Sequence, residues 1–523
     1  MRAIFKTTAI FKATSAMSAI TVAMLASNAA WADATAPCNN GTGSDSTECG
    51  TNSNTGTATD ATAVGDDSDA TGNESTAVGN IANASGQDST AIGQQANATG
   101  ARSTALGENS FATEDDATAL GQESRADFTG STAVGHGADV GGADATAIGI
   151  DTNATGVSSV ALGHDANATT TNAIAVGNGS ISSSFNSAAF GNGASAGGNS
   201  STAIGNGAEA TMGSDVAIGN ASSATGTVAT ALGSIANASG VQSTAVGGAA
   251  RAAGANSVAL GGGNQGGFSA VANGDRSIAI GGGESGSAGA LADSDGAIAI
   301  GNQSTSSGTS SIALGEGSSS DQTGSVAIGL NSNADGLSGA VAIGNSADAT
   351  DFVTTAVGSF AQANESQSAA FGGGAFADAE RATAIGTNSS ATGEGSIALG
   401  GGNGSASSAN AEGAIAIGGQ TSTVGGAQAG ALNAIALGSG TSSTGAGAIA
   451  IGADAAATQL GSIAVGENAS STGIQSAAFG INTVAGNNNT SVVGFEASAT
   501  GLSASAFGRQ ANAGGDNSTA LGR

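Results

Sequence analysis

Residue types that carry chemistry are scarce in this 523-residue chain, and its two histidines are the first to consider. His136 and His164 each directly follow a recurring glycine and lie 28 residues apart. Imidazoles act as metal ligands and as acid–base groups, so such a pair could hold a metal ion. Most residues at the equivalent position in other repeats are polar, such as Asn80, Gln94, Gln122 and Asn178. That substitution pattern favours solvent-exposed turns over a metal site.

Two further patterns resemble ligand-binding sequences without completing them. Asp66, Asp67 and Asp69 precede Gly72, but their spacing lacks the glutamate that ends an EF-hand calcium loop. The glycine-rich stretch 261–266 lacks the Lys-Ser/Thr ending and the following helix of a phosphate-binding loop. We therefore expect no catalytic residues, no cofactor and no metal ion.

The first 32 residues have the pattern of a removable export signal. Arg2, Lys6 and Lys12 form a positive start, and an apolar, uncharged stretch follows over residues 13–26. The sequence at residues 30–32, Ala-Trp-Ala, supplies a small-x-small cleavage pattern. The apolar stretch is diluted by Ala, Ser and Thr and is shorter than the roughly 20 residues that span a bilayer. The pattern favours a signal peptide over a membrane anchor.

Cys38 and Cys49 are the only cysteines, and both lie near the start of the exported chain. Export implies an oxidising compartment, which favours a disulfide between them. A lipid attachment at Cys38 is disfavoured by the preceding Thr-Ala-Pro, and a metal pair by the lack of a nearby histidine. Residues 33–60 are thus predicted to be an N-terminal cap or linker with a disulfide.

The charge balance limits the choice of partners. The chain carries 39 acidic and 10 basic residues, for a net charge of −29. Nucleic acids and anionic membranes both require basic patches, so we expect neither as a direct partner. No stalk or membrane barrel pattern follows the repeats described below, so attachment to a membrane is expected only through an anchor outside this chain.

From residue 61 to 523 the chain repeats a phrase of Ala, then Val, Ile, Leu or Phe, then Gly. The phrase occurs 32 times, with Val492 replacing Ala once, and 26 of its 31 spacings are 14 residues. A fixed period this short cannot hold a pair of helices, so it predicts a β-solenoid in which each repeat forms one coil. The longer coils near 262–300 and 401–437 carry extra residues that must loop out. Such loops are common recognition sites, although neutral drift would produce them equally.

Each coil is expected to contain two short strands. Thr90 and Ile92 share one face of the first strand, while Ala91 points to the other face. A weaker strand follows over residues 95–99. Fourteen residues enclose little space, so we place the alanines inside the coil and the Thr90/Ile92 face outside. Glycines seven residues apart mark the two turns, where glycine tolerates a positive φ.

An aliphatic ladder on the outside of a coil would be a large exposed apolar surface. Where Phe replaces the aliphatic residue, the position two before it carries Ala or Ser rather than Thr, Val or Ile; the Phe residues are Phe190, Phe371, Phe479 and Phe507, and their partners are Ala188, Ala369, Ala477 and Ser505. Exchange of volume between neighbours is typical of a packed interior. We therefore predict a symmetric oligomer. Its core includes Val64, Val78, Ile92, Leu106, Leu120, Phe190, Phe371, Phe479 and Phe507.

The phrase Ser-Val/Thr/Ile-Ala-Ile/Val/Leu-Gly at a spacing of 14 resembles the head repeats of YadA-like trimeric autotransporter adhesins, over about residues 60–523. The resemblance implies an all-β, left-handed parallel β-roll of about 32 coils that assembles as a homotrimer. It also implies attachment to extracellular matrix such as collagen or fibronectin, to host cells or to other bacteria. The chain would be exported to the surface or outer membrane of a Gram-negative bacterium, or secreted. The family's collagen-associated motif is matched most closely by Asn256, Ser257, Val258, Ala259, Leu260 and Gly261.

Two other functions remain open at this level. A non-adhesive structural surface fibre would use the same coil. An ice- or crystal-binding solenoid would use a flat threonine array, and seven successive coils carry such a column from Thr62 to Thr146. Val160 and Ile174 continue the column, which favours burial over ice contact.

Overall fold

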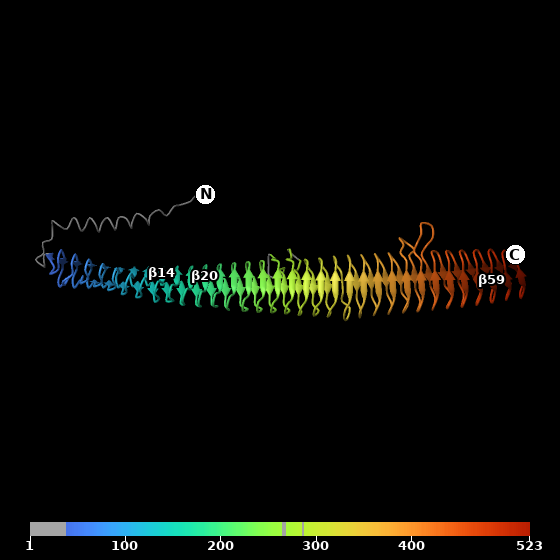
Figure 1. Ribbon diagram of the computed structural model, residues 1–523, viewed down its shortest axis with the longest axis horizontal. Coiled ribbons are helices and arrows are strands. Elements are labelled where there is room, and N and C mark those ends of the chain that lie inside the picture. The colour runs from blue at the N-terminus through green and yellow to red at the C-terminus, as the bar shows by residue number, and fades with distance from the viewer. Residues whose placement is uncertain (1–37, 264–267, 285–286) are drawn as a thin grey trace, which may run out of the picture. The chain divides into compact units, whose positions relative to one another are not determined.

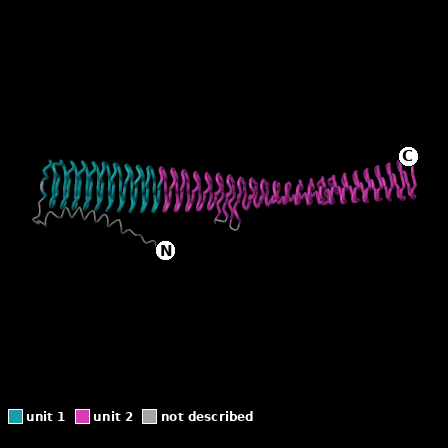
Figure 2. Tube along the Cα trace, turned by 90° about the horizontal axis from the view of Figure 1, so that it is seen from below, with its two compact units in different colours: residues 1–183 teal, residues 184–523 magenta. Residues whose placement is uncertain are grey.

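The computed structural model describes residues 38–263, 268–284 and 287–523, and these residues form a parallel β-solenoid built only from strands and turns (Figure 1). The predicted signal peptide, residues 1–32, lies outside the described residues. The chain divides into two compact units, residues 1–183 (unit 1) and 184–523 (unit 2), coloured separately in Figure 2. Within the described ranges we find no helix with the length and apolar character needed to cross a bilayer. The predicted all-β solenoid is confirmed.

Most coils of unit 1 contribute one strand to each of two sheets. The first sheet has three-residue strands: β2 (Thr47–Cys49), β3 (Thr62–Val64), β4 (Thr76–Val78), β6 (Thr90–Ile92), β8 (Thr104–Leu106), β10 (Thr118–Leu120), β12 (Thr132–Val134), β14 (Thr146–Ile148), β16 (Val160–Leu162) and β18 (Ile174–Val176). The second sheet has two-residue strands: β5 (Asn83–Ala84), β7 (Asn97–Ala98), β9 (Phe111–Ala112), β11 (Arg125–Ala126), β13 (Asp139–Val140), β15 (Asn153–Ala154), β17 (Asn167–Ala168) and β19 (Ile181–Ser182). The coils of β2 and β3 contribute only isolated bridges at Asn54 and Asp69 to the second sheet. Neighbouring strands of a sheet pair in parallel with equivalent residues opposite each other, as Ala91 lies opposite Ala105.

Unit 2 repeats the same coil. Its first-sheet strands are β20 (Ala188–Phe190), β22 (Thr202–Ile204), β24 (Val216–Ile218), β26 (Thr230–Leu232), β28 (Thr244–Val246), β30 (Val258–Leu260), β32 (Ile278–Ile280), β34 (Ile298–Ile300), β36 (Ile312–Leu314), β38 (Val326–Ile328), β39 (Val341–Ile343), β41 (Thr355–Val357), β43 (Ala369–Phe371), β45 (Thr383–Ile385), β47 (Ile397–Leu399), β49 (Ile415–Ile417), β51 (Ile435–Leu437), β53 (Ile449–Ile451), β55 (Ile463–Val465), β57 (Ala477–Phe479), β59 (Ser491–Val493), β61 (Ser505–Phe507) and β63 (Thr519–Leu521).

The second-sheet strands of unit 2 are β21 (Ser195–Ala196), β23 (Glu209–Ala210), β25 (Ser223–Ala224), β27 (Asn237–Ala238), β29 (Arg251–Ala252), β31 (Val271–Ala272), β33 (Leu291–Ala292), β35 (Thr305–Ser306), β37 (Ser319–Ser320), β40 (Asp348–Ala349), β42 (Gln362–Ala363), β44 (Phe376–Ala377), β46 (Ser390–Ala391), β48 (Ser408–Ala409), β50 (Gln428–Ala429), β52 (Ser442–Ser443), β54 (Ala456–Ala457), β56 (Ser470–Ser471), β58 (Val484–Ala485), β60 (Ser498–Ala499) and β62 (Asn512–Ala513). Equivalent residues again lie opposite each other, as Ala196 lies opposite Ala210.

The interior of each coil is a stack of small side chains. Ala91 of the first sheet, Ala98 of the second sheet and Ala96, which precedes strand β7, are fully buried. The residue before each first-sheet strand is usually a buried serine, such as Ser89. These side chains fill the narrow space between the sheets, which confirms the predicted placement of the alanines.

The glycines at the two turns differ in φ, although close stacking affects both: a Cβ atom at Gly93 would lie 2.3 Å from the carbonyl oxygen of Gly107 on the next coil. Gly93 has a φ of 138°, in the region that favours glycine. Gly100 does not have a positive φ; a Cβ atom placed there would lie 1.9 Å from the carbonyl oxygen of Glu114 on the next coil. The left-handed turn residues are instead Gln95 and Arg102, with φ of 55° and 59°. At Gly100 the prediction of a positive φ was therefore wrong, and close stacking of coils requires the glycine.

The segment expected to be a cap or linker contains one coil of the solenoid. β2 pairs in parallel with β3, and β1 (Asn39–Asn40) pairs with β2 in the antiparallel direction. A disulfide joins Cys38 to Cys49. Glu48 takes the position equivalent to the inner Ala63, and its Oε1 accepts hydrogen bonds of 2.8 Å from the backbone N–H and the hydroxyl of Thr55.

Candidate assembly and adhesive surfaces

The first candidate surface is the outer face of the first sheet. Two columns of side chains run along it in each unit. The column at the strand's first position is half-buried, as at Thr90. The column at its third position, which we call the aliphatic column, is exposed by 38% at Ile92 and 44% at Leu106. The side chain in this column is exposed in some coils and half-buried in others, and together the column forms a continuous apolar surface of a kind that marks an interaction site.

All residues predicted for the trimer core lie in this aliphatic column and point away from the alanine interior. In unit 1 they are Val64, Val78, Ile92, Leu106 and Leu120; in unit 2 they are Phe190, Phe371, Phe479 and Phe507. The four Phe side chains are 37–41% exposed. The structure therefore places them together on one face of each unit, available to a partner.

The volume exchange seen in the sequence also lies on this outer face. Phe190 and Ala188 are the two outward residues of β20, and they lie opposite Ile204 and Thr202 of the next coil. The fully buried Ala189 between them points inward. Exchange of volume between neighbouring side chains is expected only where the space around them is filled. The exchange at Phe190 and Ala188 therefore indicates that the space outside the coil is filled.

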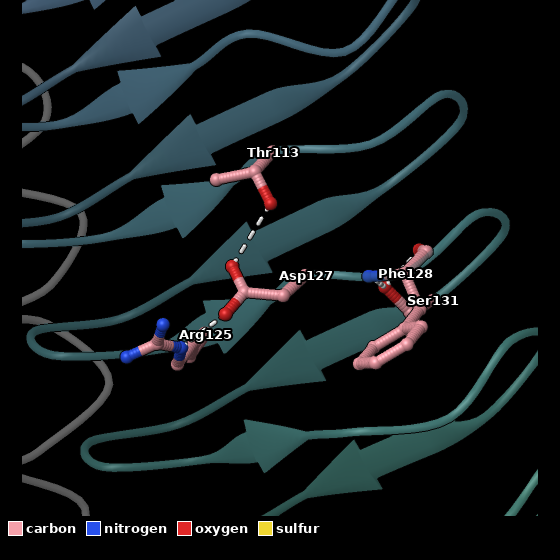
Figure 3. A network of polar contacts seen from close by, with 5 residues as sticks. All are labelled: Thr113, Arg125, Asp127, Phe128 and Ser131. Carbon is pink, nitrogen blue, oxygen red and sulfur yellow. Dashed lines mark hydrogen bonds and ion pairs between the residues drawn. The ribbon is translucent and has the colours of Figure 1, made fainter.

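The outer face of the second sheet has a different character. In unit 1 it carries Asn83 and Asn97, whose side chains hydrogen-bond to each other at 3.2 Å. Further along unit 1, Thr113 donates a 3.0 Å hydrogen bond to Asp127, which also pairs with Arg125 (Figure 3). Some polar groups on this face pair from coil to coil, and polar side chains outnumber apolar ones such as Phe111 and Ile181, so the face is compatible with water.

The threonine column weighed for ice binding belongs to the apolar face. Thr62 to Thr146 occupy the first outward position of their strands and are half-buried. Each lies beside a member of the aliphatic column, as Thr104 lies beside Leu106. The threonine column is therefore flanked along its length by a column of bulky aliphatic side chains, so the hydroxyl groups do not form this face alone.

The motif matched to collagen binding spans a turn and strand β30. Asn256 is an exposed turn residue with a φ of 57°, and Val258 and Leu260 are half-buried on the outer face. Ser257 and Ala259 are fully buried inside the coil, so they cannot touch a ligand. Direct contact by this motif is limited to three side chains, with Gly261 at the following turn.

The longer coils 401–437 offer the most distinct local shape in unit 2. Their extra residues leave the corner after the first-sheet strand and project from the stack (orange, Figure 1). Gln420 connects the two loops: its Oε1 accepts a 3.1 Å hydrogen bond from the N–H of Gly404, and its own N–H donates to Gly401 at 2.9 Å. Between these loops and the coils lies an open, mostly polar cavity of about 660 Å³.

That cavity is lined by uncharged polar groups and one carboxylate. Asn388, Ser390, Gln428 and Asp454 contribute side chains from the coils, and Val424 contributes an apolar side chain from a loop. The sequence located these loops by their spacing alone. It did not identify Gln420, because the two loops that this side chain joins are separate insertions.

Histidine positions agree with the predicted exposed turns, but the structure adds a neighbour. His136 and His164 occupy the same corner of coils two apart in unit 1, and Asp151 from the intervening coil lies between them. By contrast, Asp66, Asp67 and Asp69 do not come together as a metal-binding group in the described part of the chain.

Asp215 is a feature that the sequence analysis missed. It replaces the buried serine before strand β24 and is itself fully buried. Its carboxylate accepts hydrogen bonds of 2.8 Å from the backbone N–H groups of Met212 and Ala229. Burial raises the pKa of this carboxyl above its usual range, and the hydrogen bonds oppose that effect. Alignment of the repeats would have shown one Asp in a column otherwise filled by Ser, Ala and Thr.

Comparison with protein families gives one result. The family model described as YadA head domain repeat (2 copies) matches more than half of the chain; the matched residues are 57–80, 84–110, 112–138, 141–163, 154–180, 182–208, 238–264, 267–283, 292–318, 306–332, 320–347, 377–403, 429–455, 443–469 and 499–523. No curated protein matches the chain.

Proposed function

The chain belongs to the YadA head domain repeat family, and we propose that it is the head region of a homotrimeric, surface-exposed adhesin. Three copies would pack the outer faces of their first sheets against one another. The second-sheet faces and the projecting loops would then face water and the adhesion target.

The aliphatic column carries the argument for assembly. A column that leaves Leu106 44% exposed and Ile92 38% exposed would be a poor surface for an isolated chain in water. Full burial of an exposed side chain of this kind contributes about 1.5–3 kcal/mol, so covering the exposed part of Leu106 contributes about 1 kcal/mol. The gain is repeated in every coil, so even a modest contribution per coil produces a strong assembly. A rotation axis lets each column pack against copies of itself.

Sedimentation equilibrium of the exported chain tests the stoichiometry. We expect three chains per particle over a wide range of concentration. A folded monomer would overturn the proposal, because the aliphatic column would then be exposed in a stable protein.

A cross-linking experiment tests which face is buried. Leu106→Cys and Asn97→Cys place a thiol on the outer faces of the first and second sheets of unit 1, and Cys38 and Cys49 remain bonded to each other. A short bis-maleimide should join chains of the Leu106→Cys variant and leave Asn97→Cys chains separate. The opposite pattern would show that the polar face forms the interface.

Adhesion itself is tested by solid-phase binding to collagen, fibronectin and laminin, and to whole cells. Two variants compare the candidate contact surfaces: removal of residues 419–424, which restores a 14-residue coil, and Asn256→Gly, which keeps the left-handed turn. We expect the loop deletion to reduce binding by about tenfold, or about 1.4 kcal/mol, and Asn256→Gly to have a smaller effect. Absence of binding to every target would favour a structural fibre.

A further inference from the structure

Three successive corners of unit 1 place four potential metal ligands in one row. His136, Asp151, His164 and Asp165 all lie in the turn that leaves the first sheet. The backbone ladder holds the corners together: the N–H of Asp151 donates to the carbonyl of His136 at 2.9 Å, and the N–H of Asp165 donates to that of Ile150 at 3.1 Å. Both histidines of the chain therefore lie within one coil of the same aspartate.

The ligand atoms are close enough to share one ion. Atoms offered by Asp151, His164 and Asp165 all lie within 4.8 Å of one another. Nδ1 of His164 is 2.9 Å from Oδ2 of Asp165, and Nδ1 of His136 is 3.9 Å from Oδ1 of Asp151. Zinc binds nitrogen and oxygen ligands at about 2.0–2.2 Å, so small rotations of these side chains would bring them around one ion.

The local backbone leaves room for this arrangement. Gly137 has a φ of 63°, and a Cβ atom at this position would lie 2.5 Å from Oδ1 of Asp151. Other coils carry side chains at the equivalent position, such as Gln95 and Glu123. The four ligand side chains are 49–58% exposed, so a hydrated ion can reach them without crossing the protein.

Electrostatics also favours a cation at this corner. Two carboxylates from successive coils lie within 4.8 Å of one another and of His164. Like charges this close repel unless a positive charge lies between them. Imidazole nitrogen suits Zn²⁺, Ni²⁺ and Cu²⁺, whereas Ca²⁺ and Mg²⁺ prefer oxygen ligands alone. We propose that Asp151, His164 and Asp165 bind one divalent transition-metal ion, with His136 as a further ligand.

Isothermal titration of the exported chain with ZnCl₂ tests the site. The protein must carry no polyhistidine tag, because a tag would bind the same ion. We expect one Zn²⁺ per chain and an affinity that falls about tenfold or more in His164→Asn and in Asp151→Asn. Asn already occupies the corner equivalent to His164 at Asn178, so the first variant fits the coil.

A control variant and a control ion distinguish binding at this site from the general attraction of cations to an acidic chain. Asp67→Asn changes the same turn position as Asp151 in another coil of unit 1 and should leave Zn²⁺ affinity unchanged. CaCl₂ should bind more weakly than ZnCl₂, and His164→Asn should not change its binding. No Zn²⁺ binding up to about 1 mM, wild-type affinity in both ligand variants, or an equal loss in Asp67→Asn would each overturn the proposal.

Discussion

The two sheets of each coil share one interior but have opposite exteriors. Ala91 of the first sheet and Ala98 of the second sheet are both fully buried and face each other across the same narrow core. Outside, the first sheet presents Ile92, whereas the second sheet presents Asn97. Because the interior is equivalent, packing within one chain cannot explain the difference. The difference indicates what each sheet meets outside the chain: an apolar partner for the first sheet and water for the second.

The largest effect is expected from substitutions in the interior that the two sheets share. Ala91→Leu or Ala98→Leu inserts a large side chain where 14 residues enclose only small ones. Overpacking of this kind costs about 1–3 kcal/mol or more, and we expect both variants to lose similar stability. Thermal unfolding followed by circular dichroism measures the loss. A large loss in one variant beside a neutral result in the other would show that the two sheets do not share one core.

A smaller effect on stability is expected from substitutions on the outer face of the first sheet. Ala369→Thr and Phe371→Val restore the usual pair of outward residues on β43. Alone, the first change overfills the interface and the second leaves a gap, so each should destabilise the assembly by about 1 kcal/mol. Together they should be nearly neutral, with a coupling of about 1–2 kcal/mol in a double-mutant cycle.

Denaturation of the assembled protein gives the four stabilities that this cycle requires. The matched pair on the polar face is Ser390→Thr with Ser408→Thr, two exterior residues of adjacent second-sheet strands. This pair should be additive to within about 0.5 kcal/mol. Additive behaviour at Ala369 and Phe371 as well would contradict a packed outer face.

The smallest expected effect concerns the corner that leads into the first sheet. The pKa of Asp215 is raised in the folded state by burial, so the folded chain binds its proton more tightly than the unfolded chain does. Stability is then greatest below the ordinary aspartate pKa, and it falls as pH rises through the raised pKa. Asp215→Ser, the usual residue of this column, should remove that dependence.

Melting temperatures measured from pH 3 to pH 8 test this expectation. Wild type should lose about one or two degrees relative to Asp215→Ser as pH rises. A difference that is constant with pH, or one that grows toward acid, would show that the hydrogen bonds from Met212 and Ala229 outweigh the cost of burial.

Much of the fold could be predicted from the sequence because each coil repeats the same constraints. The 14-residue spacing fixed the register, and the size of Ala91 against Ile92 distinguished the inside of the coil from the outside. The residues predicted for the trimer core lie on the outer face that the same alternation predicts. The exact strand lengths did not follow: the second strand is only Asn97–Ala98, because the turn around Gln95 extends further than the composition suggested.

Other features depend on residues that are distant in the sequence. Gly100 is needed because Glu114 stacks on it from the next coil, and Gln420 matters because it joins two separate insertions. The grouping of His136, Asp151 and His164 likewise appears only when three coils are stacked.

The period, the coil and its inner and outer faces follow from the sequence, since these depend on side-chain size and on alternation along one strand. The stacked structure was needed to find which corners of successive coils meet, which glycines are required by stacking and where the extra loops enclose space, because those contacts join residues one or more coils apart. Their distances depend on how the stacked backbone turns at each corner, and residue type alone does not specify that turn.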